Sequence, residues 1–199
     1  RRRFVNPFWG SKPYVVTTRN SENLMRKLLL DDYPILFEGL HTTAYLGRPE
    51  LKDRIMVVRA HNVEHNYYRA LGFAERRWIK QKFFFLEANR LQNYEPILQQ
   101  AHAIAAISPM ETAYFQKTYG NTHYIPAFHS NSKVMSLPGK GDYVLYHGNL
   151  SIPENDRAAI YLVEEVFPLL SQPCIVAGSN PSQMLQNAAA KYPHIQIKA

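Results

Sequence analysis

The sequence predicts an α/β fold with two domains, each built on a parallel β-sheet. Short apolar runs of strand length alternate with longer segments whose apolar residues recur at helical spacing. These runs are continuously apolar, which is typical of strands buried on both faces of a parallel sheet. A stretch rich in Ser, Gly, Pro and Lys, residues 129–142, interrupts the alternation. We interpret it as a linker between the two domains.

Residues 1–128 form the first predicted domain. A helix is expected to begin at Ser21 as its N-cap, and a long helical segment over residues 66–100 is expected to be broken at Gly72. Strands are expected in four runs between and after these helices, at residues 33–40, 54–60, 101–108 and, more weakly, 123–128.

The segment that follows the third run carries the clearest helix signals of the chain. Ser108 is the predicted N-cap, Pro109 occupies the first turn and Glu111 completes a capping box. Gly120 is expected to end this helix.

Residues 143–199 form the second predicted domain. Strands are expected at residues 143–150 and 174–178 and from residue 194, with helices over 153–170 and 180–192. The second of these helices is expected to be capped by Asn180 and to carry Pro181 in its first turn. The order βαβαβ corresponds to half of a doubly wound domain.

Composition limits the possible partners and the compartment. The formal net charge is +7 and the pI is about 9.5, which suits nucleic acid, an anionic membrane surface or a phosphorylated small molecule. No nucleic-acid-binding motif accompanies the charge, so no nucleic acid partner is expected. The single cysteine, Cys174, lies in an apolar run and is expected in the core, which fits a reducing compartment. Neither a signal peptide nor a run of about 18 apolar residues is visible, so a cytoplasmic location is predicted.

One short motif raises the question of a metal site. His61, Glu64 and His65 match H-x-x-E-H, the pattern of the inverted zinc peptidases. That site needs both histidines on one face of a helix. Because His61 directly follows a run rich in valine, it is expected at a strand end, with His65 in the first turn of the next helix. A zinc peptidase is kept as an alternative, and no metal is expected.

Polar residues follow each of the better predicted strands. Ligands of open parallel sheets bind just outside the carboxyl ends of strands, so these residues predict a lined cleft, with the linker placing two such edges face to face. The residues concerned are Glu38, His41, His61, Asn62, Ser108, His147, Gly148 and Asn149.

The loop after the first strand of the second domain is the most informative of these. Gly148 would let the backbone approach a phosphate closely, and the following helix start would add partial positive charge. Ser151 and Glu154 are spaced as a capping box for that helix. A similar arrangement recurs one βα unit later, at Gly178. Neither loop is a dinucleotide fingerprint or a P-loop.

These motifs together resemble a known family. The segments R-x-H-N-V-E, I-S-x-x-E and above all VLYHGNLSIPEN followed by CIVAG are similar to glycosyltransferases of the GT-B fold, family four, and especially to bacterial members that build surface polysaccharides. The resemblance covers the chain from about residue 34 onward and is most specific over 143–181.

The resemblance implies two Rossmann-like domains and transfer of a hexose from a nucleotide-diphosphate sugar to a glycan or lipid-linked acceptor, with retention and without metal or cofactor. It implies that Gly148 and Asn149 lie at the donor diphosphate and that His61 faces the transferred sugar. Gly178 is added to the donor-binding candidates because its loop repeats the arrangement at Gly148. The acceptor side would be lined by Glu38, His41, Asn62 and Ser108. Peripheral contact with the inner face of the membrane is a further expectation.

Two features of the family are absent from the sequence. A glycine-rich loop after the first strand and a late pair of glutamates eight positions apart are not found. We therefore expect a fragment with two incomplete domains, poor or inactive as a catalyst on its own and prone to self-association through exposed sheet edges. A non-catalytic Rossmann-like module remains the third interpretation.

Overall fold

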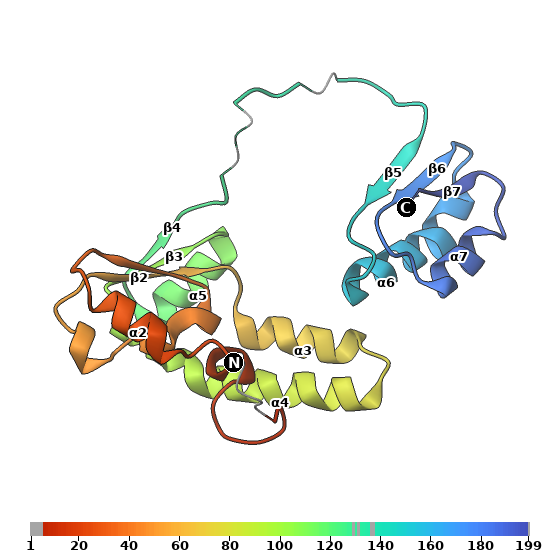
Figure 1. Cartoon of the computed structure of the whole chain (residues 1–199). Helices are drawn as coiled ribbons and strands as arrows, with labels where there is room; N and C mark the ends of the chain where they lie inside the picture. Colours follow the sequence, from red (N-terminus) through yellow and green to blue (C-terminus); the bar gives the residue numbers. More distant parts are fainter. Residues whose placement is uncertain (1–5, 129, 131, 136–137, 199) are drawn as a thin grey trace. The chain divides into compact units, whose positions relative to one another are not determined.

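The computed structural model describes residues 6–128, 130, 132–135 and 138–198. The chain divides into two compact units, Arg1–Ser130 and Asn131–Ala199, which are described separately (Figure 1). The boundary falls within the predicted linker 129–142, of which residues 129, 131, 136 and 137 lie outside the described residues.

Unit 1 contains a parallel sheet of four strands in sequential order. The strands are β1 (Ile35–Glu38), β2 (Met56–Ala60), β3 (Ala103–Ala106) and β4 (Thr122–Tyr124). Each lies within one of the predicted runs or overlaps it. The helices are α1 (Tyr14–Thr17), α2 (Glu22–Leu28), α3 (Glu64–Ala74), α4 (Trp78–Tyr94) and α5 (Pro109–Tyr119). Short 3-10 turns at Leu40–Tyr45, Pro49–Leu51 and Glu95–Gln100 complete the unit.

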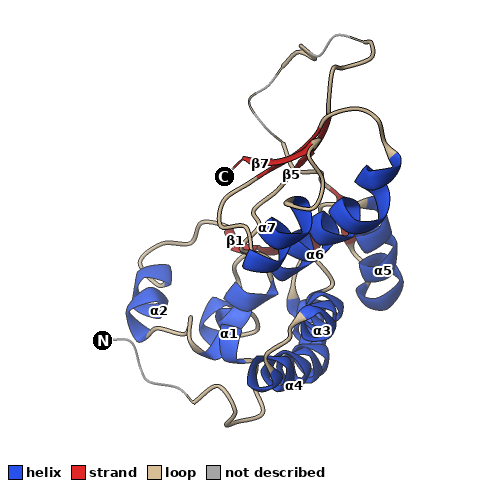
Figure 2. Ribbon diagram, turned by 90° about the vertical axis from the view of Figure 1, so that its right-hand side faces the viewer, coloured by secondary structure: helices blue, strands red, loops and turns tan. Residues whose placement is uncertain are grey.

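The long helical segment is broken later than the sequence suggested. Gly72 lies inside α3, where a Cβ would come within 2.8 Å of the Phe85 ring, so the glycine serves the packing of α3 on α4. The break lies at residues 75–77 instead, where the Glu75 carboxylate accepts the backbone N–H groups of Arg76 and Arg77. The two helices form a hairpin and lie side by side (Figures 1 and 2).

The core of unit 1 lies between the sheet and its helices, and Val58, Leu91, Ala106 and Phe115 are almost completely buried in it. The expectation that strands are buried on both faces is wrong for β1, where burial alternates and Leu36 is 57 % exposed. Alternate residues of β1 are exposed, and a continuous apolar run does not reveal that difference between its two faces.

Unit 2 has the predicted βαβαβ order. Its parallel strands β5 (Val144–His147), β6 (Cys174–Ala177) and β7 (Ile195–Lys198) are connected by α6 (Pro153–Tyr161) and α7 (Gln183–Ala189). A π turn, Leu162–Val166, and a 3-10 turn, Phe167–Leu169, extend α6. Cys174 is fully buried in the core, as expected, and its burial raises the pKa of the thiol.

The architecture is therefore α/β with two small parallel sheets. In the part of the chain that is described, no helix combines the length and apolar character that crossing a membrane requires.

Candidate functional site

The carboxyl edge of the unit 1 sheet gathers several of the predicted site residues. Glu38 ends β1 and His61 follows β2, and because these strands are parallel neighbours, both side chains lie at the same edge. Nε2 of His61 lies 2.8 Å from Oε2 of Glu38, and Nη1 of Arg59 lies 3.7 Å from the other carboxylate oxygen. The histidine and glutamate side chains are 43 % and 49 % exposed, so the pair is accessible to a ligand.

His41 lies in the turn that follows β1. Its imidazole packs over Gly39, whose φ of +85° and lack of a Cβ both suit glycine, since an added Cβ would lie 2.7 Å from Cε1 of the ring. Burial, and then the positive charges of Arg19 and His61, lower the pKa of His41.

Ser108 is the N-cap of α5, as predicted. Its hydroxyl accepts the backbone N–H of Glu111 at 3.2 Å and donates to the Glu111 carboxylate at 2.8 Å. The predicted capping box differs in one respect, because the carboxylate bonds the serine hydroxyl rather than the serine N–H. The hydroxyl of Ser108 is thus engaged in capping.

A pocket of about 360 Å³ lies between the beginnings of α3 and α5. Its lining combines aromatic and aliphatic surface with two amides and a carboxylate, from Asn62, Val63, Asn66, Tyr67, Met110, Glu111 and Tyr114. Of these, only Asn62 was predicted from the sequence. Met110 and Tyr114 lie four residues apart on α5, a helical spacing that places both on one face and could have been read from the sequence.

The H-x-x-E-H pattern does not lie on one helix. As predicted, His61 precedes α3, which begins at Glu64, and His65 lies in its first turn. His65 contacts a different carboxylate from His61, with Nδ1 3.0 Å from Oε2 of the buried Glu95. The two histidines therefore have separate partners.

Glu95 is the centre of a buried polar cluster that the sequence did not indicate. Its Oε1 accepts the hydroxyls of Tyr114 at 2.6 Å and Tyr119 at 2.8 Å, while His65 contacts the other oxygen. Burial and the hydrogen bond to Glu95 raise the pKa of both tyrosines, so they remain neutral donors. This cluster connects α3, α5 and the turn after α4, and its member Tyr114 also lines the pocket.

Glu64, the third residue of the pattern, lies in the first turn of α3. Burial raises the pKa of its carboxyl, while the positive charge of His61 opposes that shift. No group of three or more His, Cys, Asp or Glu side chains suited to a metal ion occurs within the described residues.

In unit 2, Gly148 and Gly178 follow neighbouring strands, and their loops are in contact. A Cβ on Gly178 would lie 1.8 Å from the carbonyl oxygen of Gly148, so this glycine is required by packing. A Cβ on Gly148 would be in ordinary contact, with the nearest described atom, in Asn155, at 3.5 Å. The fold therefore requires glycine at 178 and tolerates alanine at 148.

Asn149 shapes the loop after β5. Its side-chain oxygen accepts the N–H of Ser151 at 3.0 Å and the hydroxyl of the same serine at 2.6 Å. Asn155 donates to the Asn149 carbonyl at 3.0 Å. The amide group of Asn149 thus holds an Asx-type turn at the carboxyl end of β5.

Both helix caps predicted in unit 2 are wrong. Ile152 occupies the N-cap position of α6, because Ser151 is used by the turn at Asn149. The N-cap of α7 is Ser182, whose hydroxyl accepts the N–H of Leu185, whereas Asn180 adopts a positive φ of 56° in the loop before it. In each case the packing of the loop places a neighbouring residue at the N-cap position.

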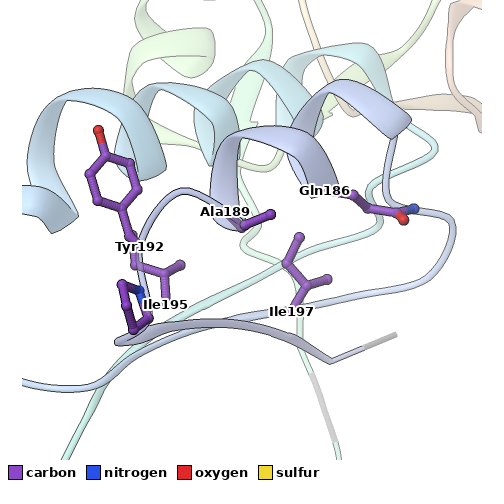
Figure 3. A pocket seen from close by; sticks show the side chains of 7 residues that line it. Gln186, Ala189, Tyr192, Ile195 and Ile197 are labelled. Carbon is purple, nitrogen blue, oxygen red and sulfur yellow. The ribbon is translucent and has the colours of Figure 1, made fainter.

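A second hollow, of about 430 Å³, lies between α7 and β7 (Figure 3). Ala189 on the helix and Ile195 and Ile197 on the strand line it. Among the described strands, β7 is paired only with β6, so this hollow lies along an open sheet edge. It contains none of the predicted site residues.

The sequence matches no protein-family model, and no curated protein or solved structure shows significant similarity to the chain. Function is therefore inferred from the residues and their geometry.

Proposed function

We propose that the chain is part of a GT-B glycosyltransferase that transfers a hexose from a nucleotide-diphosphate sugar to a glycan or lipid-linked acceptor. Transfer would proceed with retention and without a metal, in the cytoplasm at the inner face of the membrane. Support comes from two successive parallel α/β units whose polar residues gather at the carboxyl edges of the strands, where such sheets bind ligands.

The observation that carries the proposal is the difference between the two glycines of unit 2. Gly178 is explained by its contact with the Gly148 carbonyl, but the internal packing of the unit does not require a glycine at 148. Close approach of a ligand to the backbone is the remaining physical reason for a residue without a side chain. A diphosphate next to the start of α6 would also benefit from the partial positive charge of that helix end.

In unit 1, His61 is assigned to the sugar that is transferred from the donor. With the Nε2–H of His61 donating a hydrogen bond to the Glu38 carboxylate, the ring is oriented and Nδ1 is left to bond a sugar hydroxyl. The pocket at Asn62 and Glu111 offers amide and carboxylate groups beside tyrosine rings, a combination that suits the hydroxyls and apolar face of a sugar. His41, in the turn after β1, is assigned to the acceptor side, whereas the Ser108 hydroxyl is used to cap α5.

Binding of uridine and guanosine diphosphates to the 199-residue chain tests the donor site by ligand-observed NMR. Gly148→Ala is expected to weaken binding about tenfold or more, because the methyl group takes the place of the phosphate. Gly141→Ala is the matched control, since its Cβ would also be in ordinary contact, 3.6 Å from the nearest described atom. Equal affinity of both variants and the parent chain, or no binding by any of them, would contradict the proposal.

A further inference from the structure

The tip of the α3–α4 hairpin exposes large apolar side chains. Phe73 in the last turn of α3 is 70 % exposed, and Trp78 and Ile79 in the first turn of α4 are 65 % and 52 % exposed. Because the two helices run in opposite directions, these three residues lie at the same end of the hairpin. Figure 1 shows that this end extends beyond the sheet of unit 1.

The same tip is strongly basic. Residues 75–82 contain four basic residues and one acidic residue, a net charge of +3 within eight positions. Glu75, the single acid, is turned toward the backbone N–H groups of the loop and holds its shape. The ammonium group of Lys82 lies 5.1 Å from the centre of the Trp78 ring, which places a cation directly beside the apolar surface.

The tip is also a defined structure. The Gln81 side chain donates to the carbonyl of Gly72 at 3.1 Å and to that of Glu75 at 3.3 Å, which ties the two helices together across the loop. Phe73 packs edge-to-face on Phe85 with ring centroids 5.1 Å apart. The exposed rings are therefore presented by an ordered scaffold.

We propose that the tip of the α3–α4 hairpin docks the protein on an anionic lipid surface. Trp78, Ile79 and Phe73 enter the headgroup region, and Arg77, Lys80 and Lys82 bind lipid phosphates around them. Exposed Trp and Phe combined with lysine and arginine on a helix are the features of interfacial anchors. A second copy of the same tip is a poorer partner, because two surfaces of net charge +3 repel each other.

Trp78 and Trp9 are the only tryptophans of the chain, so fluorescence can locate the contact. Both are exposed, at 65 % and 82 %, and either can be replaced by phenylalanine without disturbing a core. With vesicles of equimolar phosphatidylcholine and phosphatidylglycerol, the Trp9→Phe variant is expected to show a blue-shifted emission and quenching by brominated lipid chains. The Trp78→Phe variant is expected to show neither, because its tryptophan stays in water.

The role of charge is tested by the double variant Arg77→Gln/Lys80→Gln. Each cation near an anionic surface contributes about fivefold to the affinity, so we expect vesicle binding to weaken about 25-fold. Lys27→Gln/Lys52→Gln is the control, since it removes two exposed cations elsewhere in unit 1. Far-UV circular dichroism checks that all variants are folded.

Three outcomes would overturn the proposal. The first is no binding to the anionic vesicles, which would leave the tip as a surface for an acidic protein. The second is equal binding to vesicles of pure phosphatidylcholine. The third is a blue shift that persists in Trp78→Phe and disappears in Trp9→Phe. The membrane contact rests on the membrane location included in the proposed function, but none of these results depends on glycosyl transfer, so failure of vesicle binding and failure of nucleotide binding are distinguishable.

Discussion

Replacing Glu95 by alanine tests the interpretation of the H-x-x-E-H segment. Glu95 is 2 % exposed and its carboxylate is contacted by Tyr114, Tyr119 and His65. Hydrogen bonds to a charged group contribute about 1.5–3 kcal/mol each, and they are not additive within one network. Removing one partner of a buried charged cluster costs about 3–5 kcal/mol. We expect Glu95→Ala to lower the free energy of unfolding of unit 1 by that amount.

Urea unfolding measures this change, and tryptophan fluorescence isolates unit 1 because both tryptophans of the chain, Trp9 and Trp78, lie there. Glu95→Gln is expected to lose less, about 1–2 kcal/mol, since its amide oxygen still accepts from a tyrosine. Glu22→Ala is the control. Its side chain is 93 % exposed and its contact with Arg26 is 4.0 Å long, so the change should stay below about 0.5 kcal/mol.

A loss in Glu95→Ala of less than about 1 kcal/mol, close to that of the control, would refute the reasoning. It would mean that the cluster is not an essential part of the packing between α3 and α5. If zinc increased the free energy of unfolding of the parent chain but not that of His65→Ala, the result would instead favour the metal alternative.

The remaining predictions concern three other sites. The pKa of His41 is lowered mainly by burial, so the contribution of this residue to stability is present above pH 6.5, the unshifted value, and is lost as the pH falls through the lower folded-state pKa. Between neutral and mildly acidic pH, urea unfolding should therefore show a smaller loss of stability in His41→Gln than in the parent. Parallel profiles of the two proteins would contradict this. Gly178→Ala should destabilise unit 2 by about 1–3 kcal/mol because its Cβ overlaps a carbonyl oxygen, whereas Gly141→Ala should leave the melting temperature unchanged. Ser108→Ala should cost about 1 kcal/mol through loss of the α5 cap, against almost nothing for Ser21→Ala, whose side chain makes no capping bond in the described chain; equal effects of the two would count against the capping role.

The sequence by itself determined the class of fold and the position of its strands. Apolar runs, proline and glycine act through local backbone preferences, so the strands of both units and the βαβαβ order of unit 2 follow from the order of residues along the chain. The parallel arrangement that those elements imply also predicted that Glu38 and His61 would lie at one edge of the sheet.

Only the tertiary structure decided which partner each polar group has. Nothing in the local pattern around His65 indicates that Glu95, 30 residues later, is its partner, or that two tyrosines share that carboxylate. The same holds for the glycines of unit 2, since Gly148 and Gly178 occupy similar positions in the sequence but differ in backbone conformation and in what a Cβ would meet. Strand formation depends on neighbours along the chain, whereas hydrogen-bond partners and close contacts depend on how distant segments pack, and short motifs do not specify that packing.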